Sequence, residues 1–280
     1  MNFYIINDLF SFFFSKYFQN DSNKGLIWAS SKGSLIFVDS MLKKGADAHI
    51  NAMMEASLRG HKELIKYLCM EPDDWNWALF GACRDAHRDL VHMILLEKKS
   101  FISLDFGLRG ACEGGHQDLL DLMIEKGANN WNRGLYGACM GGNPDIVNQM
   151  IEKGADNWND GLFGACFPNH RGLINLMIEK GANDWNCVMN LCCALRNRDL
   201  VHLMIKKGAN NWNEAMYTAC EVGDLDLVFL MIKKGANDWN HGLNRACYGR
   251  NQNVVNLMLQ LGATSKKKMG FGRLRESSNY

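Results

Sequence analysis

Residues 132–158 read N-R-G-L-Y-G-A-C-M-G-G-N-P-D-I-V-N-Q-M-I-E-K-G-A-D-N-W, and the same pattern then starts again. The glycine of K-G-A returns every 27 residues, at Gly127, Gly154, Gly181, Gly208, Gly235 and Gly262. The cysteine of G-A-C keeps the same interval, at Cys112, Cys139, Cys166, Cys193, Cys220 and Cys247. A fixed interval of this length is typical of a stacked array of structural repeats.

The first half of the stretch predicts a short helix. Leu135, Ala138 and Cys139 stand at positions i, i+3 and i+4, so they share one apolar helical face. Asn132 suits the N-cap, because its side-chain oxygen can accept a hydrogen bond from an unpaired backbone N–H. The pair Gly141–Gly142 then breaks the helix and permits a tight turn.

The second half predicts another helix. Asn143 is its N-cap candidate, and Pro144 suits the first helical position, where a missing N–H costs nothing. Its buried stripe is predicted to be Ile146, Val147, Met150 and Ile151. Lys153 in the last turn and Gly154 just past it are a typical stop signal. Methionine stands at one position in five successive units, where its flexible thioether suits an interface between imperfect copies: Met150, Met177, Met204, Met231 and Met258.

Neither helix can bury its apolar face alone, whereas stacked pairs cover one another. The run A-C-M-G-G-N-P-D-I-V-N-Q-M-I-E-K-G-A-D resembles the second half of an ankyrin repeat, and the match recurs through residues 25–264. The resemblance implies an all-α, ankyrin-like solenoid of stacked helix pairs. The usual unit has ~33 residues and carries T-P-L-H-x-A, which this chain lacks. Because the missing residues fall where ankyrin repeats carry a β-hairpin, we expect short loops there. The recurring G-A-N-D-W-N is similar to ankyrin-type proteins of giant DNA viruses such as mimiviruses.

We expect three segments. Residues 1–24 do not repeat, and their aromatic and aliphatic side chains share one helical face, which predicts a capping helix; a signal peptide and a segment that docks on another protein are the alternatives. Residues 25–264 form the solenoid, with nine units counted at the A-C position. Residues 265–280 are a basic tail that we expect to be disordered, and Lys266–Lys268 are a weak signal for nuclear entry.

Composition narrows the function classes. The net charge of +1 gives no bulk field that favours nucleic acid or a membrane, so we expect neither as a partner. Seven of the ten cysteines occupy one repeat position. Stacked helices lie about 8–10 Å apart, whereas a disulfide needs Cα atoms within about 7 Å. We therefore expect reduced, buried thiols in a cytoplasmic protein.

Neither catalytic chemistry nor a cofactor or metal site is predicted. Cys112 and His116 lie four residues apart, but no second ligand pair accompanies them. No carboxylate pair and no Ser/His/Asp or Cys/His set interrupts the repeat. We expect a protein that is not an enzyme.

Two ladders of side chains follow the repeat. Tryptophan recurs between the helix pairs, where we expect each ring to pack on neighbouring units in place of the missing hairpin; an exposed ladder for a ligand is the alternative. Its members are Trp131, Trp158, Trp185, Trp212 and Trp239. Lysine recurs near the ends of the second helices, where it favours the helix C-terminus; a phosphate or acidic partner is the alternative. Its members are Lys126, Lys153, Lys180, Lys207 and Lys234.

Three columns on the first helix of each unit vary while their surroundings repeat, and they stand at positions i, i+3 and i+7 of one helical face. Resemblance to ankyrin arrays implies that this face is concave and binds partners, and large aromatic and arginine side chains suit protein recognition. Drift on an unused surface is the alternative. The candidate binding residues are Arg109, Arg133, Tyr136, Met140, Phe163, Phe167, Asn190, Tyr217, Glu221, Asn244 and Tyr248.

We therefore expect a monomeric protein–protein interaction scaffold, a viral protein that binds a host protein through its concave face. The alternative function is an adaptor that recruits substrates to ubiquitin ligase machinery through residues 1–24.

Overall fold

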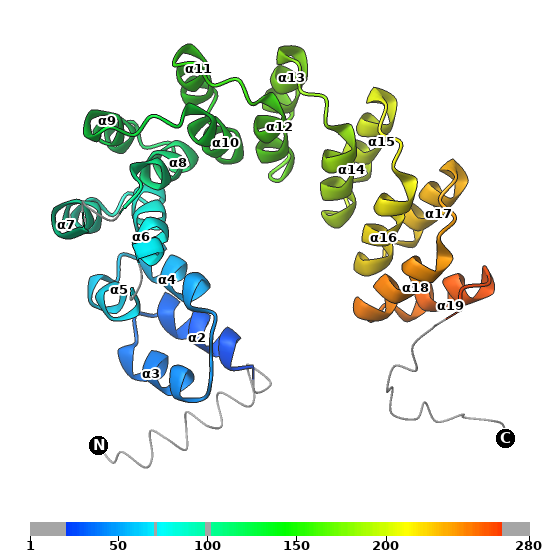
Figure 1. Cartoon of the computed structure of the whole chain (residues 1–280), viewed down its shortest axis with the longest axis horizontal. Helices are drawn as coiled ribbons and strands as arrows, with labels where there is room; N and C mark the ends of the chain where they lie inside the picture. Colours follow the sequence, from blue (N-terminus) through cyan, green and yellow to red (C-terminus); the bar gives the residue numbers. More distant parts are fainter. Residues whose placement is uncertain (1–20, 70–71, 99–101, 265–280) are drawn as a thin grey trace. The chain divides into compact units, whose positions relative to one another are not determined.

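The structure, a computed structural model, describes residues 21–69, 72–98 and 102–264 (Figure 1). Within these ranges the chain forms eighteen helices and no strand, so the expected all-α, solenoid-like repeat fold is confirmed. The helices follow one another in nine pairs, as the nine A-C positions suggest. The predicted tail, residues 265–280, lies outside the described residues, and so do residues 1–20 of the predicted cap.

The chain divides into two compact units, residues 1–182 and 183–280. The helices of the first unit are α2 (Ser22–Ser31), α3 (Leu35–Lys43), α4 (His49–Leu58), α5 (Lys62–Leu68), α6 (Pro72–Arg84), α7 (Arg88–Lys98), α8 (Leu104–Gly114), α9 (Gln117–Lys126), α10 (Trp131–Gly141), α11 (Pro144–Glu152), α12 (Trp158–Cys166) and α13 (Arg171–Lys180). Those of the second unit are α14 (Trp185–Ala194), α15 (Arg198–Lys207), α16 (Trp212–Val222), α17 (Leu225–Lys234), α18 (Trp239–Tyr248) and α19 (Gln252–Gln260). In each unit the first helices of successive pairs contact one another, and each also contacts its own second helix.

The predicted core positions are buried. Leu135, Ala138 and Cys139 of α10 are fully inaccessible, and so are the methionines of the repeated position. Ile151 is different from the prediction, because it is only half-buried.

Glycines of the first helices let the layers approach closely. A Cβ at Gly134 would lie 2.4 Å from the sulfur of Met150, and one at Gly137 would lie 2.5 Å from the carbonyl oxygen of Arg109 in the preceding first helix. At Gly137 the obstacle is backbone, whereas at Gly134 it is a methionine side chain that would have to shift. The repeated G-L-x-G-A-C therefore fixes the interfaces within and between helix pairs.

The stop signals of the second helices are confirmed. Gly127, Gly181, Gly208 and Gly235 follow the last helical residue with φ between 109° and 118°, a left-handed conformation that glycine adopts without steric cost. Each such turn is closed by backbone hydrogen bonds, for example from the Gly127 N–H to the Ile124 carbonyl oxygen at 3.0 Å.

The predicted N-cap of the first helix is wrong by two residues. Helix α10 begins at Trp131, and its N-cap is Asn130, whose side chain accepts a hydrogen bond from the Arg133 backbone N–H. The same position caps the later first helices of the array, through the side chains of Asn157, Asp184, Asn211 and Asp238. The second N-cap, Asn143 before Pro144, lies where the sequence predicts it.

Asn132 instead bonds the first helix of its pair to the loop that follows the pair. Its Oδ1 accepts from the backbone N–H groups of Asp156 (2.8 Å) and Asn157 (2.9 Å), and its Nδ2 donates to the Asp156 carboxylate (3.1 Å). In the second unit Asn186 makes the same contacts with Asn210 and Asn211. Each loop is thus held by backbone hydrogen bonds to the preceding first helix. This asparagine ladder satisfies loop donors without a β-hairpin.

Candidate functional site

The three variable columns lie on the first helices, and within each compact unit we call the surface that they form the inner face of that unit. Figure 1 shows that the even-numbered helices run along one side of each compact unit and the odd-numbered helices along the other. The core residues of the same helices are buried. A helix such as α10 therefore buries one repeated stripe and presents the variable one.

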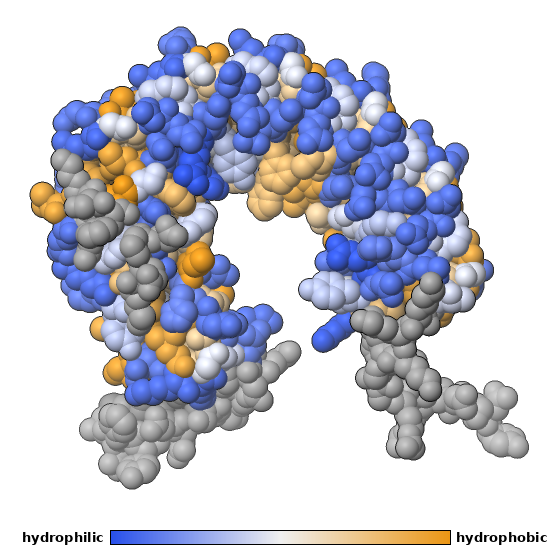
Figure 2. Space-filling model, in the orientation of Figure 1, coloured by the Kyte–Doolittle hydropathy of each residue, from blue (hydrophilic) through white to orange (hydrophobic). Residues whose placement is uncertain are grey.

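In the first unit the candidate residues are accessible to different degrees. Arg109, Arg133, Tyr136, Met140 and Phe163 are half-buried, while Phe167 keeps 54% of its surface exposed. Figure 2 shows hydrophobic side chains gathered on this side of the molecule beside α12. An exposed phenylalanine on this face makes α12 the most apolar part of the candidate surface.

Two arginines of this face stack on aromatic rings. The guanidinium carbon of Arg109 lies 4.9 Å from the Phe80 ring centre and 4.7 Å from that of Tyr136. The guanidinium carbon of Arg133 lies 4.0 Å from the ring centre of Phe106. Cation–π contacts of this kind hold a flexible side chain in one orientation. The array thus fixes two cations before any partner binds.

A partly buried carboxylate stands beside them. Glu113 lies 3.5 Å from the Arg84 Nε and 3.9 Å from an Arg109 Nη. Desolvation raises its pKa, and the attraction of the two guanidinium groups opposes that shift without cancelling it. Its Oε2 atom and the Nε of Arg109 are buried without a hydrogen-bond partner.

In the second unit Tyr217 departs from the expected placement. Only 8% of its surface is exposed. Its Oη donates to Asp238 Oδ2 at 2.6 Å, and its ring stacks on His241 with centres 4.1 Å apart. The prediction that Tyr217 belongs to an accessible binding face is therefore wrong, because residues at the start of the next first helix, α18, cover its ring.

The other candidates of the second unit differ in accessibility. Tyr248 is 75% exposed, and Asn244 is exposed as well. Asn190 and Glu221 are half-buried, and Glu221 pairs with an Nη of Arg245 at 2.9 Å. Among the candidate residues of this unit, Tyr248 is therefore the large ring that is exposed.

Within the first unit the inner face carries a depression of about 600 Å³ at the starts of α10 and α12. Arg109, Arg133 and Tyr136 line it, together with Asp160 and the amides of Asn130, Asn132 and Asn157. It thus brings three of the predicted residues together in one polar cavity.

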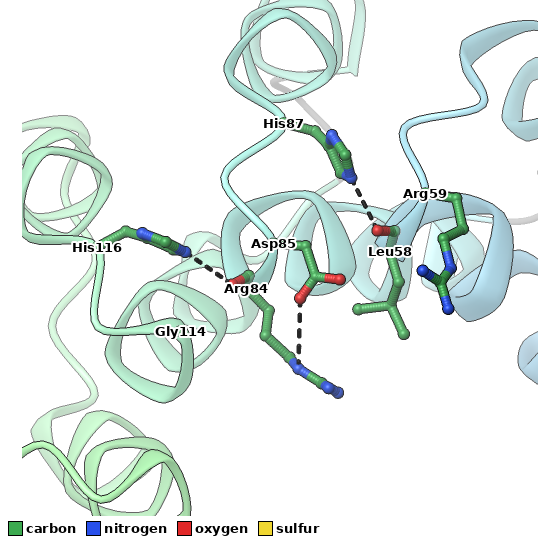
Figure 3. A pocket seen from close by; sticks show the side chains of 7 residues that line it. All are labelled: Leu58, Arg59, Arg84, Asp85, His87, Gly114 and His116. Atoms are coloured by element: carbon green, nitrogen blue, oxygen red, sulfur yellow. Dashed lines mark hydrogen bonds and ion pairs between the residues drawn. The ribbon is translucent and has the colours of Figure 1, made fainter.

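A second polar depression, of about 590 Å³, lies where first helices end and second helices begin (Figure 3). His87 and His116 point from its wall to backbone carbonyl oxygens of the preceding unit, those of Leu58 (2.8 Å) and Arg84 (3.0 Å). Asn143 and Asn251 make the equivalent contact elsewhere. These histidines therefore satisfy helix carbonyl groups, which gives them a structural use.

The tryptophan ladder has a structural place. Each ring is half-buried and belongs to the first residue of a first helix, rather than to a loop. The Lys153 Nζ lies 5.2 Å from the Trp131 ring centre, and Lys180 and Lys234 lie 5.9 Å from the rings of Trp158 and Trp212. The lysine at the end of each of these second helices thus contacts the tryptophan at the start of the first helix of the same pair.

The cysteines of the repeated position are buried, apart from the half-buried Cys247. Burial raises the pKa of Cys112, Cys139, Cys193 and Cys220 to about 12. These thiols are therefore protonated at neutral pH, and a protonated thiol is a poor nucleophile and a poor metal ligand.

The described residues contain neither a candidate metal site nor a candidate membrane-spanning helix. No set of three or more His, Cys, Asp or Glu side chains there could hold a metal ion. No described helix is long and apolar enough to cross a membrane.

Two residues that contact the candidate side chains, the buried Phe80 and the half-buried Arg84, are not found with the 27-residue interval. Phe80 and Arg84 occupy the column positions of Arg109 and Glu113 one unit earlier. The spacing between these units is 29 residues rather than 27, which hides the correspondence. The two residues are found when the columns are extended to α6, the first helix of the third pair, with an offset of 29 residues.

Comparison with known proteins gives no family assignment. No protein-family model matches the chain. No curated protein is significantly similar to it.

Proposed function

We propose that this chain is a non-enzymatic protein-interaction scaffold that binds a partner through its inner face. The proposal is carried by one contrast: within the same helices the repeated stripe is buried, whereas the variable columns hold accessible rings and arginines. A surface that served packing alone would carry the same residue types in every repeat, as the buried stripe does. Aromatic and arginine side chains are also the types enriched in the energetically dominant positions of protein interfaces.

The finer assignment rests on sequence resemblance. The second half of each unit is similar to an ankyrin repeat, and G-A-N-D-W-N is similar to proteins of giant DNA viruses. We therefore propose an ankyrin-like viral protein that acts as a monomer in the host cytoplasm and binds a host protein. The short, asparagine-bonded loops are compatible with an ankyrin-like array that has lost its hairpins.

Two double variants with matched exposure test the use of this face. Phe167→Ala with Tyr248→Ala removes the exposed rings of the inner face, which are 54% and 75% accessible. Phe229→Ala with Leu96→Ala removes side chains of the second helices that are 52% and 84% accessible. Each tagged full-length protein is purified from the cells that produce it, and the co-purified proteins are quantified by mass spectrometry.

Loss of the same partner from the inner-face variant alone is the expected result, by about tenfold or more if both rings belong to the minority of interface residues whose truncation costs over about 1 kcal/mol. Thermal melts of both variants should match the parent, since exposed rings contribute little to packing. Loss of the partner from the Phe229/Leu96 double variant alone would contradict the proposal. Ubiquitin ligase subunits among the partners, retained by both variants, would instead support the adaptor function.

A further inference from the structure

We propose that the inner face of α8, α10 and α12 binds an acidic peptide segment of the protein partner, with a carboxylate of that segment between Arg109 and Arg133. This inference rests on the proposed function and names the chemistry of its partner. An apolar side chain of the same segment would contact Phe163 and Phe167. The argument depends on charge, on orientation and on the surface next to the depression.

The charges of the depression are not balanced. Among the described residues, no carboxylate oxygen lies within ion-pair distance of the Arg133 guanidinium. Arg109 has only the 3.9 Å contact with Glu113, which it shares with Arg84. The one acid in the lining, Asp160, accepts from the Asn157 side-chain amide at 2.7 Å. The lining thus holds two guanidinium groups and one carboxylate, and the neighbouring Glu113 is shared with Arg84, so the depression has an excess of positive charge that favours an anion.

Both arginines are also held in place. Arg109 lies between the rings of Phe80 and Tyr136, and Arg133 lies over the ring of Phe106. Stacking occupies the flat faces of a guanidinium, and its N–H groups lie in the plane and remain able to bind a carboxylate. Because little side-chain entropy is left to lose, a carboxylate should bind these groups better than it binds mobile surface arginines.

Apolar side chains continue the surface from the depression. The Tyr136 ring lines the depression and also contacts α12, since a Cβ at Gly164 would lie 3.4 Å from that ring. Phe163 follows on α12, and the exposed Phe167 is the C-cap residue of that helix. A free carboxylate ion would use only the polar part, whereas a peptide with an acidic and an apolar side chain would use both.

The test uses the full chain and a randomised peptide library displayed on phage. Peptides that bind the chain are sequenced, and the strongest one is synthesised with a fluorophore. Its affinity is measured by fluorescence anisotropy, next to an analogue with Asp and Glu replaced by Asn and Gln and an analogue with its large apolar residues replaced by Ala.

Selected peptides should combine an acidic with a large apolar residue, and each analogue should bind about tenfold more weakly, the usual effect of removing one partner of a charge pair or an anchoring side chain. Arg133→Gln should weaken binding of the acidic peptide by about tenfold but leave the amide analogue unaffected. Arg59→Gln, which removes an exposed charge from the C-terminal end of α4, is the matched control and should change neither.

Asp160→Asn separates binding from folding, because a damaged protein cannot gain affinity. It removes the acid of the depression and should strengthen acidic peptide binding about threefold, as expected for one less repulsive charge nearby. Enrichment of basic or uncharged peptides, or no enrichment at all, would overturn the inference. So would an Arg133→Gln variant with unchanged affinity for the acidic peptide.

Failure here is distinguishable from failure of the proposed function. If the cellular partner is lost from the Phe167/Tyr248 variant but retained by Arg133→Gln, the inner face is a binding surface for a partner of other chemistry. If the partner is retained by both the Phe167/Tyr248 variant and Arg133→Gln but lost from the Phe229/Leu96 variant, the proposed function itself is wrong.

Discussion

Truncation of one ladder asparagine should weaken the array measurably. In the second unit Asn186 Oδ1 accepts from the backbone N–H groups of Asn210 (2.8 Å) and Asn211 (2.9 Å), and Asn186 Nδ2 lies 3.3 Å from Asn210 Oδ1. Asn186→Ala removes all three hydrogen bonds. It leaves two backbone donors of the loop without their protein acceptor.

The magnitude follows from these contacts. A typical intramolecular hydrogen bond contributes about 0.5–1.5 kcal/mol net, so three could contribute ~3 kcal/mol. Asn210 and Asn211 are exposed, and water can replace part of the loss. Alanine also favours a helix more than asparagine does, by about 0.5 kcal/mol. We therefore expect Asn186→Ala to lower the free energy of unfolding by about 1–2 kcal/mol.

The chain offers a matched control at the same position of α8. There Asp105 accepts from the backbone N–H groups of Asn129 (3.1 Å) and Asn130 (3.0 Å), so a carboxylate can replace the amide. Asn186→Asp should therefore cost less than about 0.5 kcal/mol, since it keeps both backbone bonds and suits the helix N-terminus. Urea unfolding followed by tryptophan fluorescence measures both variants. Equal losses for alanine and aspartate would refute the ladder as a source of stability.

Three other changes test the packing and the buried tyrosine. Met204→Ala should lower the free energy of unfolding by about 2–5 kcal/mol, because the side chain is fully buried. A loss of only about 0.3 kcal/mol in urea melts would show that Met204 is not packed between the stacked helices. Gly137→Ala should cost about 1–3 kcal/mol, because its Cβ would lie 2.5 Å from a backbone oxygen, that of Arg109; an unchanged melt would contradict that close approach. Tyr217→Phe should cost about 1 kcal/mol at neutral pH, where its hydrogen bond to Asp238 is lost. That hydrogen bond is the largest cause that lowers the pKa of Asp238 below its ordinary 3.8, so its contribution is present above pH 3.8 and is lost as the pH falls through the lowered pKa. The difference between the parent and Tyr217→Phe should therefore shrink in urea melts at lower pH; a difference that stays constant would show that Asp238 is not the partner that matters.

Local signals made the helix pairs predictable. The helix breaks at Gly142 and Gly127, the proline at the start of α11 and the apolar faces all act within a few residues of chain, so the sequence alone places them. The stacked arrangement followed from the fixed interval, because identical pairs can cover only their neighbours.

Side-chain contacts between successive repeats could not be predicted from local sequence signals. Asn130 and Asn132 are both suited to cap a helix, and only the loop that follows 24 residues later shows that Asn132 is occupied elsewhere. Tyr217 shares its column with accessible side chains. Its own ring is buried because it bonds to Asp238 and stacks on His241 of the next helix pair. In both cases the partner lies across a repeat interface, where side-chain identity varies from copy to copy.

Site-specific photo-crosslinking tests the central claim, that the inner face is the binding surface. A benzophenone amino acid replaces Phe167 on α12 or, as the matched control, Phe229 on α17, whose exposed fractions are 54% and 52%. Both proteins are irradiated in the cells that produce them, and adducts are identified by mass spectrometry. We expect a covalent adduct with one specific protein from position 167 and none with that protein from position 229. An adduct from position 229 alone would contradict the central claim.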